Sequence, residues 1–225
     1  MTASTAKPCI PLGVKVLHSD NRDLFSATNL DSPAGNEGPA IDGLGYFPGF
    51  ISESEEAELL ASVDAAPWLP DLRRRVQHLG YKYDYKARRV DQSMYLGPLP
   101  PWVRTLVDRL VTAGHVTAVP DQLIVNEYLP GQGISSHVDC VPCFGPILCG
   151  LSLGSQILMD LAPAAGGEKI SILLEPRSLL VLAGAARYQW KHAIAARKTD
   201  RIAGQLVQRR RRVSLTFRNV IRDGD

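Results

Sequence analysis

The strongest constraint on the fold lies after residue 120, where short apolar segments follow one another, separated by Pro and Gly. Many short strands at close spacing are typical of an antiparallel sandwich or barrel rather than of alternating β and α units. The segments that we predict to be strands are QLIVNEY (122–128), ILCGLSLG (147–154), QILMDLA (156–162), KISILLE (169–175), SLLVLAG (178–184) and RVSLTFRNV (212–220).

The first part of the chain is different in composition. Residues 1–44 include SATNLDSPAGNEGPA, which is rich in Ser, Asn, Gly and Pro and poor in large apolar residues. Such a segment buries too little apolar surface to offset the entropy of ordering it. We therefore expect an irregular segment over 1–44 and a single domain over 45–225, beginning with a short strand and turn at GYFPGFI.

Two helices are predicted ahead of the β segments. Ser52 or Ser54 can cap a helix through SESEEAELLASVDAA, whose acidic first turn suits the helix dipole. PWVRTLVDRLVTAG, residues 101–114, has the apolar spacing of a second amphipathic helix. Two supporting helices and a β core predict an α+β fold.

The bulk composition indicates a soluble protein without revealing its partner. The formal net charge is +2, too small to indicate nucleic-acid binding by itself. The first residues lack the apolar core of a secretory signal, and no apolar run approaches the roughly 20 residues of a membrane helix. We expect a cytoplasmic monomer with no membrane association.

Three of the four cysteines, Cys140, Cys143 and Cys149, lie close together. Cys140 and Cys143 form a C-x-x-C, which can mark a zinc site or a redox pair. A structural zinc site normally has a second ligand pair at a recognisable spacing, and none is evident. We therefore expect reduced thiols in the core or in a loop, as in most intracellular proteins.

The last predicted strand alternates in polarity. Arg212, Ser214, Thr216 and Arg218 fall on one face, and apolar residues fall on the other. A polar face is often simply solvated. It gains a second interpretation if another polar group of the protein lies opposite it.

His137 and Asp139 form such a group. Their i, i+2 spacing on an extended chain points both side chains the same way. Of the five histidines, His192 alone follows this pair within the β region. Two histidines and one carboxylate can form a facial triad that leaves metal positions open, although an isolated H-x-D is a weak signal.

Over residues 45–220 the sequence resembles the AlkB family of iron(II)- and 2-oxoglutarate-dependent oxygenases. NEYLPGQGISSHVD (126–139) looks like the family's approach to its first two iron ligands, and SLGSQILMDL, PRSLLVLAGAARYQWKHAI and RVSLTFRNV look like its later strands. Residues 114–134 share the run GHxxxxPDQLxxNxYxPGQGI with the branch that contains the tRNA wobble-uridine hydroxylases. The resemblance implies a double-stranded β-helix, or jelly-roll, core with a substrate-covering lid.

The resemblance also implies a set of roles. His137, Asp139 and His192 would ligate iron, Arg212 would pair with the distal carboxylate of 2-oxoglutarate, and Arg218 with the carboxylate nearer the metal and also with Asp139. Asn126 and Tyr128 would hydrogen-bond this cosubstrate, and Ser214 would belong to the same cosubstrate-binding set. Ser214 stands where DNA-repair members often carry Asn, which puts the substrate in doubt but not the chemistry. Dioxygen would be consumed, succinate released, and a carbon on or near a base nitrogen hydroxylated.

Residues 73–89 are basic and aromatic, and in the family they correspond to the lid. Arginines can pair with phosphates and tyrosines can stack on bases, so Arg74, Tyr81, Tyr83 and Tyr85 are predicted to contact nucleic acid. The candidates are single-stranded DNA or RNA, tRNA included. The alternative is a solvated hairpin whose tyrosines pack on the core.

Two further groups are open to both structural and functional interpretations. Tyr188 and Trp190 precede His192 at even spacing on a predicted strand, so they either line the substrate pocket, as we predict for Trp190, or pack in the core. Arg209, Arg210 and Arg211 form a solvated loop or a phosphate-contacting rim.

Three functions remain possible from the sequence. The first is an oxygenase that demethylates or hydroxylates bases in DNA repair or tRNA modification. The second is a hydroxylase or demethylase of protein side chains or a small metabolite. The third is a binding module with an inactive site, which the complete set of expected ligands disfavours.

Overall fold

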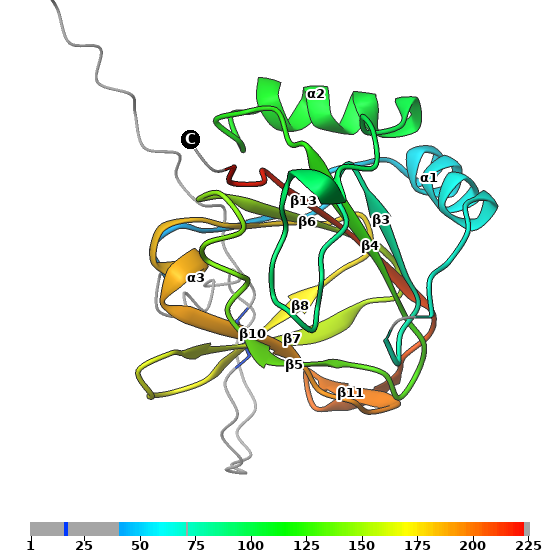
Figure 1. The fold of residues 1–225 in the computed structure, drawn as a ribbon. Coiled ribbons are helices and arrows are strands. Elements are labelled where there is room, and N and C mark those ends of the chain that lie inside the picture. The colour runs from blue at the N-terminus through cyan, green and yellow to red at the C-terminus, as the bar shows by residue number, and fades with distance from the viewer. Residues whose placement is uncertain (1–15, 18–40, 71, 223–225) are drawn as a thin grey trace, which may run out of the picture.

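The computed structural model describes residues 16–17, 41–70 and 72–222, and its core is two antiparallel sheets that face each other (Figure 1). The large sheet has the strand order β2 (Leu44–Phe47), β9 (Leu179–Leu182), β6 (Leu148–Gly154), β13 (Arg212–Arg218), β4 (Gln122–Tyr128) and β3 (Val76–Leu79). The small sheet has the order β1 (Val16–Leu17), β8 (Ile170–Leu174), β7 (Ile157–Pro163), β10 (Trp190–Ile194) and β5 (Ile134–His137). A separate hairpin joins β11 (Thr199–Ile202) and β12 (Gln205–Gln208). Together the sheets form the expected jelly-roll core.

Three helices cover the outer face of the large sheet (Figure 1). They are α1 (Glu53–Ala65), the short 3-10 helix η2 (Pro101–Val103) and α2 (Arg104–Thr112). Val213, Leu215 and Phe217 of β13 point toward them and are buried with Leu59 and Val63 of α1. The polar side chains of β13 consequently face the space between the sheets.

The predicted cap of α1 is confirmed. The Ser52 side chain accepts a hydrogen bond from the Glu55 amide, and the Glu55 carboxylate accepts one from the Ser52 amide. This reciprocal arrangement satisfies two amides that would otherwise lack helical partners. None of the helices in the described ranges is long and apolar enough to cross a membrane.

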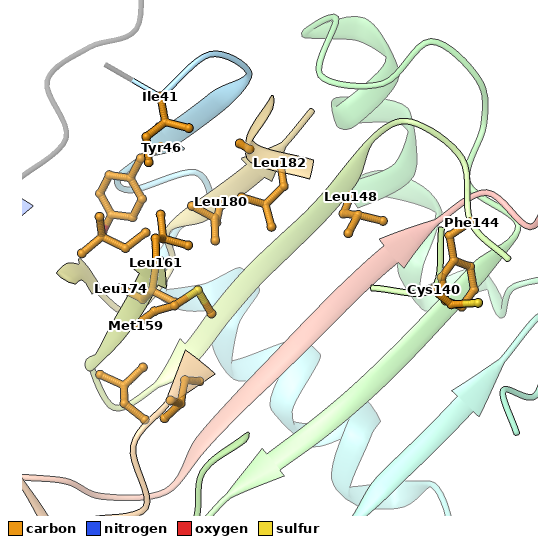
Figure 2. Packing of buried hydrophobic residues seen from close by; sticks show 14 of the residues in the cluster. Ile41, Tyr46, Cys140, Phe144, Leu148, Met159, Leu161, Leu174, Leu180 and Leu182 are labelled. Carbon is orange, nitrogen blue, oxygen red and sulfur yellow. The ribbon is translucent and has the colours of Figure 1, made fainter. Parts of the chain in front are cut away.

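The interior between the sheets is apolar at one end (Figure 2). Leu180 and Leu182 of the large sheet pack with Met159, Leu161 and Leu174 of the small sheet. Burying one such side chain contributes about 1.5 to 3 kcal/mol. This cluster holds the two sheets together and closes one side of the cavity described below.

The sequence did not indicate several elements. Strand β1 lies within the segment that we expected to be irregular and pairs with β8; the other residues before 41 lie outside the described part of the chain. The short strands β3, β5, β11 and β12 and the short helices η1 (Gln92–Met94) and α3 (Gly184–Tyr188) were also not predicted.

Residues 73–89 form the covering segment, which contributes five residues to the lining of the cavity described below. Gly80 lies where this segment leaves β3. Its φ is +80°, and a Cβ there would lie 1.9 Å from the Asp121 carbonyl oxygen. Only glycine adopts this conformation without strain in so little space. The chain can therefore leave β3 sharply and pass over the opening between the sheets.

Candidate active site

A cavity of about 630 Å³ opens between the two sheets. The polar face of β13 lines one wall, and residues of β5 and β10 line the opposite wall. The predicted residues that line it are Arg74, Tyr83, Tyr85, Asn126, Tyr128, His137, Asp139, His192, Arg212, Ser214 and Arg218. The polar face of β13 therefore lies opposite a second polar group, His137, Asp139 and His192, and is not simply solvated.

His137, Asp139 and His192 lie together, with one ligand atom from each within 4.8 Å of the others. Strands β5 and β10 bring the histidines side by side, because His137 and His192 are direct partners in the antiparallel ladder. Asp139 follows two residues after His137. Its Oδ1 lies 3.2 Å from Nε2 of His137 and 3.7 Å from Nε2 of His192.

The protonation of these groups suits a metal. Nδ1 of His137 lies 2.7 Å from the Ser135 carbonyl oxygen. Because a carbonyl only accepts, Nδ1 carries a proton, which leaves Nε2 available as a ligand. Burial lowers the pKa of His192 to about 4, so this imidazole is neutral at pH 7 and also offers a lone pair.

Asp139 is held ionised from the opposite sheet. Nε and Nη2 of Arg218 donate to its Oδ2 at 2.9 and 2.7 Å. Burial alone would raise the pKa of Asp139, but the Arg218 charge holds that pKa well below its usual range. A buried anion next to two imidazole nitrogens is the donor set that borderline divalent cations prefer.

Arg212 and Arg218 also fit an anionic ligand. Arg212 is 2% exposed, and its Nη2 donates to the Ser152 hydroxyl at 2.9 Å. Its Nε and Nη1, and Nη1 of Arg218, are buried with no hydrogen-bond partner among the described residues. Buried donors of this kind are normally satisfied, so the cavity presents three unused guanidinium nitrogens to a ligand with carboxylates.

Asn126 and Tyr128 lie on β4 beside this pair of arginines. The Tyr128 ring is 5.3 Å from the Arg212 guanidinium carbon. Asn126 accepts a hydrogen bond from Nε of Arg74 at 2.9 Å. Arg74 thereby connects the covering segment to the cavity wall.

The predicted substrate residues fall into two groups. Arg74, Tyr83 and Tyr85 line the cavity, and the two tyrosine rings pack edge to face at 5.0 Å. Tyr81 is 2% exposed and packs on Tyr95 instead, because the chain leaves the regular strand at Leu79 and the three tyrosines do not share one strand face.

Trp190 and Tyr188 are not among the residues that line the cavity. Trp190 starts β10 and packs against the inter-sheet cluster, which agrees with the core alternative. Tyr188 lies in α3 and is 41% exposed, so the predicted common strand face of Tyr188, Trp190 and His192 is wrong.

The interpretation of residues 209–211 as a solvated run or rim is wrong for two of the three arginines. Arg209 is 5% exposed and donates to both carboxylate oxygens of Asp200, and Arg211 is paired with Glu127 and Asp64. Only Arg210 is exposed. Acidic partners therefore neutralise Arg209 and Arg211.

The expectation of reduced thiols at Cys140 and Cys143 is also wrong. The turn after Asp139 brings their Cα atoms to 5.2 Å, and the structure joins them in a disulfide. Both sulfur atoms lie 3.3 to 3.4 Å from the Arg88 carbonyl oxygen of the covering segment. Cys149 remains a free, buried thiol, and burial raises its pKa to about 12.

Sequence reasoning missed three residues next to the site. Ser152 positions Arg212, and Arg88 lines the cavity. Phe144 packs beneath the Arg218 guanidinium at 4.8 Å. The sequence does contain a signal for Ser152, which is the single serine in the otherwise apolar run ILCGLSLG.

Two facing antiparallel sheets that enclose two histidines, one carboxylate and a pair of buried arginines define a metal-dependent oxygenase of the jelly-roll type. Residues 43–218 match the model of the 2OG-Fe(II) oxygenase superfamily. The chain belongs to this superfamily and, within it, to the AlkB family. It is therefore an oxidoreductase that uses iron(II), 2-oxoglutarate and dioxygen.

Curated relatives agree with this assignment. The chain is 37% identical to the "Alkylated DNA repair protein ALKBH8 homolog" of Arabidopsis thaliana, with 98% of this chain and 72% of that protein covered. It is 36% identical to the mouse "tRNA (carboxymethyluridine(34)-5-O)-methyltransferase ALKBH8" over 76% of this chain, but it spans only 29% of that protein.

A solved structure supports the fold alone. The protein described as "The structure of OsALKBH1" superposes with a TM-score of 0.57 at 17% identity, covering 79% of this chain and 96% of that one.

Proposed function

We propose that this protein oxidises modified bases in single-stranded nucleic acid, with tRNA as the leading substrate. In this proposal His137, Asp139 and His192 bind the iron, and Arg212 and Arg218 bind the carboxylates of 2-oxoglutarate. When bound, iron and 2-oxoglutarate supply an oxidant that puts one oxygen atom of dioxygen into a C–H bond and the other into succinate, with release of carbon dioxide.

The observation that carries the cosubstrate assignment is the unsatisfied guanidinium of Arg212. A buried charge without a partner costs several kcal/mol of folding free energy. A protein keeps such a charge where a bound ligand pairs with it. A carboxylate matches the planar fork of donors. The unused Nη1 of Arg218 lies in the same cavity and suits the second carboxylate of a dicarboxylic acid.

Other side chains orient the cosubstrate and exclude water. Ser152 fixes one nitrogen of Arg212, which aims the remaining two into the cavity. Tyr128, Asn126 and Ser214 provide polar atoms on the same wall. Phe144 packs below Arg218 and shields its contact with Asp139 from solvent.

The covering segment supports nucleic acid as the substrate class. Arg74 and Arg88 place positive charge beside Tyr83 and Tyr85 where the covering segment lines the cavity. Arginines attract phosphates, and tyrosine rings stack on a base that has left a duplex or belongs to a single strand. The names of the plant and mouse relatives refer to alkylated DNA and to tRNA, which are both nucleic acids.

Succinate release tests the proposal. The protein is incubated with iron(II), ascorbate and 2-oxoglutarate, together with unmodified or modified tRNA, methylated single-stranded DNA, or the matching duplex. We expect stimulation by one single-stranded class, with an affinity that falls as salt rises. Turnover that no oligonucleotide stimulates would refute nucleic acid as the substrate and direct the search to proteins or metabolites.

A pair of variants tests the role of the covering segment. Arg88→Ala removes a charge at the cavity, whereas Arg210→Ala removes an exposed charge from the residues outside it. We expect Arg88→Ala to weaken oligonucleotide binding several-fold more than Arg210→Ala does. Equal effects would mean that net charge, rather than the covering segment, attracts the nucleic acid.

A further inference from the structure

Arg187 is a buried cation whose described hydrogen bonds include none to a carboxylate. It lies in α3, five residues before His192, and is 1% exposed. It heads the largest fully buried side chains of the described residues. Taking a guanidinium out of water costs several kcal/mol unless polar groups replace the lost hydration.

Four main-chain carbonyl oxygens replace that hydration. Nη1 donates to Asp139 at 3.1 Å, Nη2 to Cys140 at 3.3 Å and to Phe144 at 3.2 Å, and Nε to Gly145 at 3.4 Å. All four acceptors belong to the turn 139–145. One planar side chain therefore fixes the path of this whole turn.

The turn needs such support because it carries Asp139 outside the sheet. Strand β5 ends at His137, so Asp139 lies two residues beyond the last described strand residue, whereas both histidines are in paired strands. Arg218 holds the Asp139 carboxylate, but among the described residues Arg187 is the side chain that holds the Asp139 carbonyl.

We propose that Arg187 is a positioning residue that sets the Asp139 carboxylate relative to the two histidines by fixing the main chain of residues 139–145. This inference rests on the proposed iron site. Because Arg187 comes from α3, which leads directly into β10, it ties the turn of Asp139 to the strand of His192. Arg187 thereby fixes the position of Asp139 relative to His192.

Cobalt(II) binding to the full chain tests the inference without relying on turnover. Affinity is measured by calorimetry, and ligand geometry by the visible absorption of bound cobalt(II). Arg187→Met removes all four hydrogen bonds, and Arg187→Lys keeps the charge but has three donors instead of the fork. Arg209→Lys is the matched control, since Arg209 is also buried but binds Asp200, away from the cavity lining.

We expect Arg187→Met to weaken cobalt(II) binding at least tenfold and to change its spectrum, and Arg187→Lys to recover part of both. Arg209→Lys should lower the melting temperature but leave cobalt(II) affinity and spectrum unchanged. Native affinity and spectrum in the Arg187→Met variant would overturn the inference. So would failure of both variants to fold, because Arg187 would then be a structural residue.

The result also separates this inference from the proposed function. If the unmodified protein itself failed to bind cobalt(II) at His137, Asp139 and His192, the proposed iron site would be wrong. If the unmodified protein bound cobalt(II) and the Arg187 variants bound it equally well, only the positioning role would be wrong.

Discussion

Replacing Arg212 by methionine should make the protein more stable and less able to bind its cosubstrate. Burial lowers the pKa of Arg212 below the ordinary value of arginine, to about 10. At about 1.4 kcal/mol per pKa unit, this corresponds to a folding cost of about 3 kcal/mol. Because the folded-state pKa is depressed, the cost is fully present below about pH 10 and disappears as pH rises toward the ordinary pKa of arginine.

Methionine is unbranched and apolar and fills much of the same space. We expect Arg212→Met to raise the free energy of unfolding of the cosubstrate-free protein by about 1 to 3 kcal/mol, the range seen when apolar residues replace buried ions. The same change removes the partner of a buried carboxylate, which costs about 2 to 4 kcal/mol of binding. The dissociation constant for 2-oxoglutarate should therefore rise about 30- to 1000-fold.

Arg209→Met is the matched control. Arg209 is equally buried but pairs with Asp200, so its removal leaves a buried carboxylate unpaired and should cost about 3 to 5 kcal/mol. The measurements are urea unfolding of the metal-free protein at pH 7 and calorimetric titration of 2-oxoglutarate in the presence of manganese(II). An Arg212→Met protein as unstable as the Arg209→Met protein, with unchanged cosubstrate affinity, would refute the reasoning.

Three further substitutions have defined outcomes. His137→Ala should abolish succinate release while changing the free energy of unfolding by less than about 1 kcal/mol, since this side chain is 31% exposed; retained turnover would contradict its role as a ligand. Gly80→Ala should lower the free energy of unfolding in urea by more than about 2 kcal/mol, because φ is +80° and the Asp121 carbonyl lies in the way; a neutral effect would contradict this. The hydrogen bond to Arg109 lowers the pKa of Glu55 to about 2, so the stabilisation by this carboxylate is present above about pH 4.5 and is lost as pH falls toward 2. Because the pair is about one-third exposed, Glu55→Gln should cost about 0.5 kcal/mol at pH 7 and nothing near pH 2; a difference that persists at pH 2 would contradict this assignment.

Alternation in polarity predicted the strands that matter most for the site. Arg212, Ser214 and Arg218 share a face because a strand has a period of two, and the apolar residues between them must pack inward. The structure confirms both faces of β13. Periodicity is reliable here because one face is buried under helices and the other lines a cavity.

Short segments and distant partners could not be predicted. Tyr81, Tyr83 and Tyr85 alternate like a strand, but in the described part of the chain the β3–β4 ladder ends at Leu79 and an isolated bridge from Tyr81 to Tyr95 follows. The burial of Arg209 depends on Asp200, whose proximity follows from the β11–β12 hairpin. Arg187 likewise looks like an ordinary helix residue until the turn 139–145 folds around it.

The contact between Asp139 and Arg218 has a mechanical consequence. Asp139 follows the small sheet and Arg218 belongs to the large one, so this pair spans the two layers. The distance between the two sheets therefore sets the position of Arg218 relative to Asp139. Leucine and methionine side chains packed between the sheets determine that distance. Enlarging one of these side chains would change the Asp139–Arg218 contact without altering any group that takes part in the chemistry.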